Sequence, residues 1–318
     1  MRAERRKKKK NKKLKIFGFV FLLLLFSGFA YGATVYTSLQ KAVNTMQGSD
    51  HKSEKRQEEV AFTEKDPLSI LILGVDERQN DRGRSDTMIV MTVNPKKESI
   101  ELLSIPRDTR TEIVGHGTVE KINHAYSYGG VKMSLSTIEN FLDIPIDYYV
   151  KMNMEGFTDI VDAVNGINVE NDMYLSHKGY EFPKGSLTLN GEEALVYSRI
   201  RKEDKQRGDF GRQMRQRQVI QAIIKKGASV NSLTNFDDIF QALGKNVETN
   251  MNFDEIKDIQ KNYRPAINHI EQYTIAGEGS RLEDGLWYYI VPEEEKHKVQ
   301  ARLKKHLDLS ISTAQQPG

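Results

Sequence analysis

Arginine is dense in one short stretch of this 318-residue chain, between Tyr197 and Gln218. The stretch holds eight cationic side chains and only three acids. The cations are Arg199, Arg201, Lys202, Lys205, Arg207, Arg212, Arg215 and Arg217. Six of the eight are arginine, whose planar guanidinium offers paired donors that match phosphate oxygens. The stretch is therefore a candidate phosphate-binding site, with a solvated basic face as the simpler alternative.

The second half of this stretch is predicted to begin a helix. Asp209 is the expected N-cap, and Arg212, Arg215 and Gln216 share one helical face by their spacing. Arg212 and Gln216 lie in the first two turns, where the helix dipole favours an anion. Three other cations are expected to be solvated instead: Lys202, Lys205 and Arg217.

Polar residues also stand at the ends of predicted strands. Asp76 lies in LILGVDER, Asp86 in GRSDTMIV and Arg107 in SIPRDT. If these strands are neighbours, the two carboxylates can converge at one sheet edge and form an oxygen site for Mg²⁺. A metal ion combined with arginine is how phosphoryl-transfer sites neutralise charge. The alternative is that each acid simply caps a turn or a helix.

Hydrophobic periodicity predicts the elements that must position these residues. Strands are expected at Leu68–Leu73, Thr87–Val93, Ile100–Ile105, Tyr148–Met152, Ile167–Val169 and Leu286–Val291. Helices are expected at Val131–Leu142, Glu155–Val164, Asn190–Tyr197, Asp209–Lys226, Phe236–Leu243, Phe253–Asn262 and Glu293–His306. Because strands alternate with helices, we expect an α/β or α+β sandwich with a central mixed β-sheet flanked by helices.

The N-terminus has the charge pattern of a membrane anchor. Residues 1–15 contain ten lysines and arginines and one glutamate, and residues 16–36 form an uncharged run rich in phenylalanine and leucine. A helix over that run, at about 1.5 Å per residue, crosses a bilayer core of roughly 30 Å. The positive-inside rule then places everything after residue 36 outside the cell. A cleavable signal peptide is the alternative, although its apolar part is usually only about 7 to 15 residues.

These features divide the chain into five parts. They are a cytoplasmic stub (1–15), a transmembrane helix (16–36), an extracellular stalk or linker (37–66), one extracellular domain (67–308) and a flexible tail (309–318). The chain after residue 15 has 37 basic and 43 acidic residues, a net charge of −6, so its arginines are a local concentration. This distribution and the topology argue against a nucleic-acid partner.

Residue types that the chain lacks narrow its chemistry. It has no cysteine, which excludes disulfides and thiolate metal sites. His116 and His124 have no obvious partner in the local sequence, and we expect both to be surface residues.

Several motifs together resemble the LytR-CpsA-Psr family of Gram-positive cell-wall enzymes. They are LILGVDER, GRSDT, SIPRDT, KINHAYSYGG and YSRIRK followed by DFGRQMRQRQVI. The resemblance implies an enzyme that takes a wall glycopolymer, wall teichoic acid being the expected one, from an undecaprenyl pyrophosphate carrier. The polymer would be joined through a phosphodiester to the 6-hydroxyl of N-acetylmuramic acid in peptidoglycan.

The resemblance also implies roles for matching residues. Asp76 and Asp86 would hold Mg²⁺, or Mn²⁺ as the alternative ion, and would be catalytic together with Arg107. The pyrophosphate would be bound by Arg84, Arg107, Lys121, Arg199, Arg201, Arg212 and Gln216, of which Arg84 and Lys121 are the weaker candidates. The prenyl chain would occupy an apolar tunnel between sheet and helices, whose lining the sequence does not identify.

Two other functions remain open at this stage. A wall-tethered receptor for lipid pyrophosphates or teichoic acid would need the arginines but not the acids. A membrane-anchored regulator of transcription or wall turnover is the other, but a cytoplasmic part of 15 residues is too short to read DNA.

Overall fold

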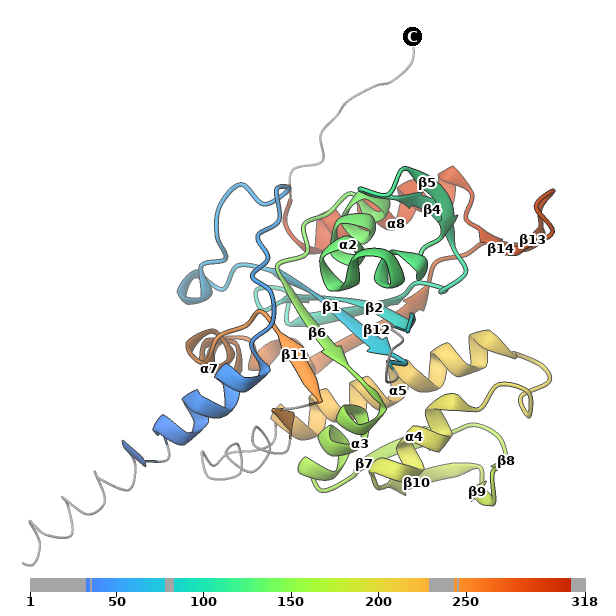
Figure 1. The fold of residues 1–318 in the computed structure, drawn as a ribbon. Helices are drawn as coiled ribbons and strands as arrows, with labels where there is room; N and C mark the ends of the chain where they lie inside the picture. Colours follow the sequence, from blue (N-terminus) through green and yellow to red (C-terminus); the bar gives the residue numbers. More distant parts are fainter. Residues whose placement is uncertain (1–32, 35, 78–82, 229–242, 245, 310–318) are drawn as a thin grey trace, which may run out of the picture.

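A computed structural model describes residues 33–34, 36–77, 83–228, 243–244 and 246–309 of the chain (Figure 1). Its centre is a six-stranded sheet with the order β11-β6-β1-β2-β3-β12. The strands are β1 (Leu68–Val75), β2 (Ser85–Asn94), β3 (Ser99–Ser104), β6 (Tyr148–Met152), β11 (Val247–Thr249) and β12 (His269–Thr274). The β1–β6 and β3–β12 pairs are parallel and the other three are antiparallel, which confirms the predicted mixed sheet.

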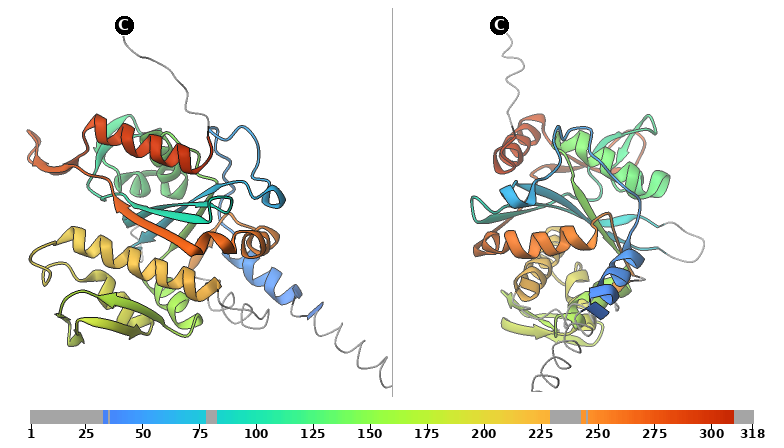
Figure 2. Two further views of the ribbon diagram at one scale, coloured as in Figure 1. Left: turned by 180° about the vertical axis from the view of Figure 1, so that it is seen from behind. Right: turned by 90° about the vertical axis from the view of Figure 1, so that its left-hand side faces the viewer.

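Helices cover both faces of this sheet (Figures 1 and 2). One face carries α2 (His124–Leu142) and α8 (Glu293–His306). The other carries α3 (Met154–Ala163), α4 (Gly191–Arg199), α5 (Asp209–Ala228) and α7 (Phe253–Asn262). The predicted flanking helices are confirmed at these positions, and the expected helix at 236–243 lies almost entirely outside the described residues.

Smaller elements surround the sheet, and most were not predicted. Two-stranded pairs are formed by β4 (Arg110–Ile113) with β5 (Thr118–Lys121), β7 (Ile167–Asn171) with β10 (Gly185–Leu189), β8 (Leu175–His177) with β9 (Tyr180–Phe182), and β13 (Glu278–Arg281) with β14 (Trp287–Ile290). Two short 3₁₀ helices occur at Phe62–Glu64 and Arg264–Asn268. These strands are short and partly exposed, so their sequences lack the continuous apolar run that identifies a central strand.

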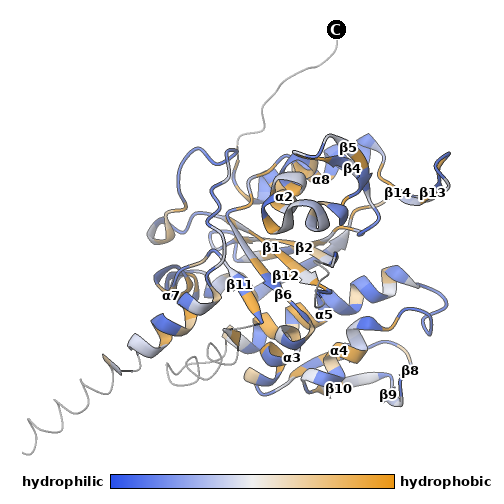
Figure 3. Ribbon diagram, viewed as in Figure 1, coloured by the Kyte–Doolittle hydropathy of each residue, from blue (hydrophilic) through white to orange (hydrophobic). Residues whose placement is uncertain are grey.

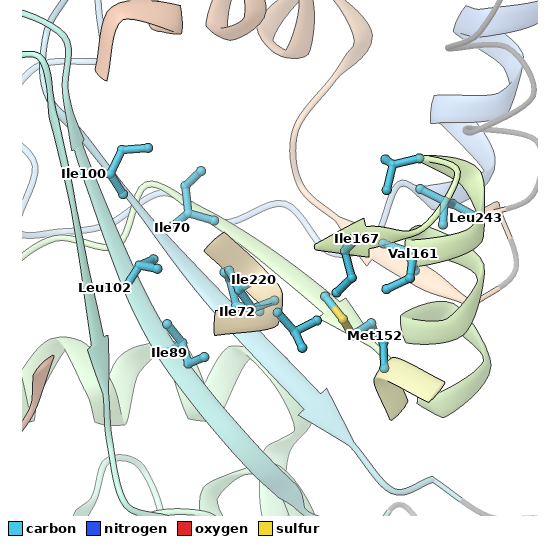
Figure 4. Packing of buried hydrophobic residues seen from close by; sticks show 14 of the residues in the cluster. Ile70, Ile72, Ile89, Ile100, Leu102, Met152, Val161, Ile167, Ile220 and Leu243 are labelled. Carbon is cyan, nitrogen blue, oxygen red and sulfur yellow. The ribbon is translucent and has the colours of Figure 1, made fainter. Parts of the chain in front are cut away.

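Strand β1 is buried on both faces, as its apolar run predicts. Ile70 and Ile72 pack into the core on the α5 side, whereas Leu71 and Leu73 pack against α2 and α8. Figure 4 shows the first of these cores between the sheet and the helices that cover it. In Figure 3 the central strands are largely hydrophobic, while much of α5 is hydrophilic. The hydrophilic side of α5 therefore needs polar partners or solvent.

An irregularity in the β1–β2 pairing brings the two predicted acids together. Gly74 pairs with Thr87 and Val75 pairs with Ser85, so Asp86 is the extra residue of a bulge. The Asp76 backbone N–H donates to the Arg84 carbonyl at 3.3 Å. Gly83 has a φ of +65°, and a Cβ there would lie 2.1 Å from the Asp76 carbonyl oxygen. Only glycine therefore permits this close approach.

Part of the segment 37–66, which we expected to be a stalk or linker, packs against the domain. Residues 36–46 are helical, and Leu39, Val43 and Met46 are buried in the core on the α5 side. The polar composition of 37–66 hid these few apolar residues, so the sequence did not reveal that this part packs against the domain. No helix in the described part of the chain is long and apolar enough to cross a membrane. The expected transmembrane helix, 16–36, lies mostly outside the described residues.

A buried ion pair fixes α5 beside the end of α4. The side chain of Arg215 is 1% exposed and that of Asp204 is fully buried, with 2.9 Å between Nη1 and Oδ2. Arg215 also donates to the Ile200 carbonyl, and Arg207 donates to the same Asp204 carboxylate. Burial raises the pKa of Asp204, but the bonds from these arginines outweigh it and leave the pKa lowered. This stabilisation is complete above the ordinary carboxyl pKa of about 3.9 and is lost as pH falls through the lower folded value.

We predict that Asp204→Ala lowers the free energy of unfolding by about 3 to 5 kcal/mol, because it leaves the Arg215 charge buried without a partner. Urea denaturation at neutral pH measures the change. Asp254→Ala, which removes an exposed acid paired with Lys257, serves as the control and leaves the midpoint nearly unchanged. Equal midpoints for the two variants contradict the structural role of Asp204.

Candidate functional site

A cavity of about 380 Å³ lies where β1, β2 and β6 approach α3, α4 and α5. Seven residues singled out from the sequence line it: Asp76, Asp86, Arg107, Arg199, Arg201, Arg212 and Gln216. They come from two parts of the chain, residues 76–107 at the sheet ends and residues 199–216 at the helix ends, which are more than 90 positions apart. The two halves of the predicted site are therefore brought to one place by the fold.

A second cavity of about 580 Å³ adjoins the first. The two share Asp76, Asp86 and Arg107. The two weaker candidates, Arg84 and Lys121, line only the second cavity. Their separation from the arginine cluster means that they face a different part of any ligand.

Ion pairs balance the charge of the first cavity. Arg107 Nη1 lies 3.0 Å from Asp86 Oδ1. Arg212 Nη2 lies 2.7 Å and Arg201 Nε 3.4 Å from the Asp209 carboxylate. Asp209 begins α5, where we expected it to act as N-cap, but its carboxylate is used by these arginines and by the Gln213 side chain. It thereby holds two cations at the mouth of the site.

The guanidinium of Arg212 has unused capacity to bind an anion. Its side chain is 12% exposed, and the buried Nε has no hydrogen-bond acceptor in the described part of the chain. Burial lowers the pKa of Arg212, and the positive charges of Arg107 and Arg201 act in the same direction. For Arg107, burial also lowers the pKa, but Asp86 and Asp108 outweigh it and the net pKa is raised. A bound anion would relieve the crowding of positive charge around Arg212.

One wall of the first cavity is apolar and was not identified from the sequence. It is formed by Ile72, Val75, Met152, Met154, Phe157, Leu195 and Ile220. These side chains come from β1, β6, α3, α4 and α5. Residues on five elements share no spacing along the chain, so no local pattern could reveal the wall. Charged and apolar surfaces thus meet within one cavity, as binding of an amphiphile requires.

Other cations of the arginine-rich stretch have structural roles. Arg217 was expected to be solvated, but it is 7% exposed and donates to the Ser104 and Thr274 hydroxyls, each at 2.7 Å. Burial lowers the pKa of Arg217 to about 10. The helix turns this side chain toward β3 and β12, a direction that charge alone does not predict. Lys202 and Lys205 are exposed as expected.

Arg215 does not share the cavity with Arg212 and Gln216, despite the helical spacing. It is buried against Asp204, while Arg207 forms a two-bond contact with Asp172 at 2.7 and 3.1 Å. Helical spacing places residues on a broad face, and only the packing around α5 decides which of them reach a cavity.

His124 was expected to be an unpaired surface residue, and that expectation was wrong. It lines the second cavity, and its Nδ1 lies 2.7 Å from Glu120 Oε2. The spacing of four between Glu120 and His124 was visible in the sequence, but these residues lie on β5 and at the start of α2, so helical periodicity does not relate them.

Comparisons with known proteins find a family match and similar proteins from bacteria. Residues 33–305 match the LytR_cpsA_psr family. The chain is 50% identical to the polyisoprenyl-teichoic acid–peptidoglycan teichoic acid transferase TagU of Bacillus subtilis (strain 168), over 97% of this chain and 100% of that protein. The crystal structure of B. subtilis TagU superposes with a TM-score of 0.64 at 48% identity, covering 78% of this chain and 99% of that one. The structure of TagT bound to LIIa-WTA superposes with a TM-score of 0.70 at 31% identity, covering 83% and 99%.

We predict that Arg212→Gln weakens binding of inorganic pyrophosphate about 10- to 100-fold, because a hydrogen bond to a charged group contributes about 1.5 to 3 kcal/mol. Isothermal titration calorimetry measures the affinity. Lys202→Gln is the matched control, since it removes one exposed cation of the same stretch outside both cavities. If the two variants lose affinity equally, pyrophosphate is attracted by the general field and not by the cavity.

Proposed function

Because the chain belongs to the LytR_cpsA_psr family, we propose that it transfers wall teichoic acid from an undecaprenyl pyrophosphate carrier to peptidoglycan. The bond formed is a phosphodiester to the 6-hydroxyl of N-acetylmuramic acid. One observation carries the proposal for this chain: two carboxylates, a cluster of arginines and an apolar wall meet in a single cavity. A prenyl pyrophosphate with its metal ion has a part to match each of these surfaces. The pyrophosphate anion suits the arginines, the metal ion suits the carboxylates, and the hydrocarbon chain suits the apolar wall.

The prenyl pyrophosphate donor fits the first cavity when each of its parts is set against residues of matching charge or polarity. The pyrophosphate lies against Arg107, Arg201 and Arg212, whose guanidinium groups supply donors for its oxygens. Arg199 and Gln216 line the same cavity and extend this set. The first isoprene units lie along the wall that includes Phe157, Leu195 and Ile220.

The two acids fit a magnesium ion that is shared with the substrate. Among the described residues no group of three or more His, Asp or Glu side chains could hold a metal by itself. Mg²⁺ commonly uses one or two carboxylates and completes its shell with phosphate oxygens and water. Asp76 and Asp86 would hold the ion, and Mn²⁺ has the same preference for oxygen ligands. When bound, the metal ion would neutralise the negative charge that develops on the pyrophosphate.

The residues of the chain then assist transfer by position and charge. Arg107, held by Asp86 at 3.0 Å, and Arg212, held by Asp209, are fixed before the substrate arrives. Preorganised cations of this kind stabilise the negative charge of a phosphoryl-transfer transition state without a cost of reorganisation. The acceptor hydroxyl attacks the phosphorus that carries the glycan, and prenyl phosphate leaves.

A receptor that binds without chemistry is the second candidate, and the acids distinguish it from the transferase. A receptor has no need for two carboxylates beside the arginines. The bulge that places Asp86, and the glycine that lets Asp76 approach Arg84, are more readily explained by a metal-dependent reaction.

We predict that Asp76→Ala and Asp86→Ala each reduce transfer at least 100-fold, since each removes a charge needed to hold the ion. The assay combines the purified protein, an undecaprenyl-pyrophosphate-linked glycan, Mg²⁺ and peptidoglycan oligomers, with mass analysis of the acceptor. A chelator abolishes turnover of the wild-type protein and added Mg²⁺ restores it. Asp254→Ala is the control and keeps full activity. Transfer that persists in both cavity variants, or in chelator, contradicts the proposed mechanism.

We further propose that the domain acts on the outer face of the cell membrane, behind a single N-terminal anchor. The charge asymmetry of residues 1–36 supports this topology, and the proposed acceptor is found only outside the cytoplasm. Protease added to intact protoplasts should digest the domain, while a cytoplasmic marker protein survives. Protection of the domain until the membrane is broken contradicts the topology.

A further inference from the structure

The second cavity offers a polar surface beside the proposed donor site. It shares Asp76, Asp86 and Arg107 with the first cavity. The rest of its lining is polar or small: Gly83, Arg84, Asp108, Lys121, Asn123, His124 and Ser127. It therefore lacks the apolar wall that suits the prenyl chain, and it suits a hydroxylated ligand that approaches the same phosphorus from another direction.

His124 is held in this cavity next to Arg107. The backbone N–H of the preceding residue, Asn123, donates to the Arg107 carbonyl at 3.3 Å. Asn123 is 4% exposed, and its Oδ1 has no hydrogen-bond partner in the described part of the structure. The first turn of α2 thus begins directly beside the residue that pairs with Asp86. An unpaired buried acceptor and an imidazole line the same cavity as the acids.

The orientation of the His124 ring is fixed from one side. Its Nδ1 lies 2.7 Å from Glu120 Oε2, and the same carboxylate oxygen accepts a bond from the Tyr128 hydroxyl at 2.9 Å. The Tyr128 ring meets the imidazole edge-on, with centroids 6.1 Å apart. Nε2 makes no hydrogen bond to another described residue. When Nδ1 donates its proton to Glu120, Nε2 is left with a lone pair available to a ligand.

Charged groups from several elements surround this imidazole. The acids are Glu120, which contacts the ring directly, and the more distant Asp76, Asp86 and Asp108. The cations that line the same cavity are Arg84, Arg107 and Lys121. Asp108 and Lys121 are paired at 2.9 Å and Asp86 with Arg107 at 3.0 Å, so these charges largely cancel. Of the charged groups named here, Glu120 is the one that contacts the imidazole.

We propose that His124 is the general base for the acceptor hydroxyl and that the second cavity holds the acceptor sugar. The proposal rests on the transferase function given above, and Glu120 acts in it as a positioning residue. The hydroxyl oxygen forms a bond to the glycan-bearing phosphorus, and the bond from that phosphorus to the prenyl phosphate oxygen breaks. The bonding pair leaves with prenyl phosphate, and the hydroxyl proton moves to Nε2 and then to solvent.

The test compares His124→Gln with wild type in the transfer assay, using the full chain in detergent. We expect kcat to fall about 100-fold or more, the usual contribution of a general base, with the KM for the donor unchanged. The acidic limb of the wild-type profile of kcat against pH should disappear. Glu120→Gln should move that limb to lower pH, because loss of the carboxylate destabilises the imidazolium.

His116→Gln is the matched control. His116 stacks on Tyr128 from the same region but does not line the second cavity, so its variant keeps the wild-type kcat and pH profile. Thermal melting checks that each variant is folded. If His124→Gln does not fold, the proposal is judged by whether Glu120→Gln shifts the acidic limb of the pH profile. A folded His124→Gln with wild-type kcat, or an unmoved limb in Glu120→Gln, overturns the proposal. Absence of transfer by the wild-type protein instead overturns the function on which it rests.

Discussion

The crowding of positive charge is the constraint on which the site depends. Arg107, Arg201 and Arg212 line one cavity, and their mutual repulsion must be offset before a substrate binds. Asp86 offsets the first and Asp209 the other two, at distances of 2.7 to 3.4 Å. These ion pairs hold the arginines in place. Because two acids face three arginines, the positive charge is not fully neutralised. The cavity therefore keeps an attraction for an anion that carries more than one charge.

The elements around this cluster are also held by arginines that have specific partners. A second set of arginines in the same stretch is turned away from the cavity and into the interior. Arg207 and Arg215 donate hydrogen bonds to the Asp204 carboxylate, and Arg217 donates to the Ser104 and Thr274 hydroxyls. Helix α5 is thereby fixed on both sides, toward α4 and toward the sheet. A helix anchored in this way can present Arg212 and Gln216 to the cavity with little freedom to move.

The two cavities share one charged wall, but they suit different parts of the reaction. The first has an apolar side, which suits the lipid carrier, and the second is polar, which suits a sugar. A displacement at phosphorus needs the entering and leaving oxygens on different sides of the reacting atom. The shared wall of Asp76, Asp86 and Arg107 is where these two requirements meet. The dyad of His124 and Glu120 supplies a proton acceptor on the polar side.

The sequence by itself identified seven charged and polar residues that line the first cavity and the type of fold that carries them. Strong local signals were sufficient: the continuous apolar run of β1, the apolar spacing of the helices and the acids at strand ends. Tertiary structure alone decided the apolar wall, the burial of Arg217, the pairing of Arg215 with Asp204, and the pairing of His124 with Glu120. The reason is physical, since the helix period limits a side chain to a face, whereas the neighbouring elements decide whether that face meets solvent, sheet or cavity.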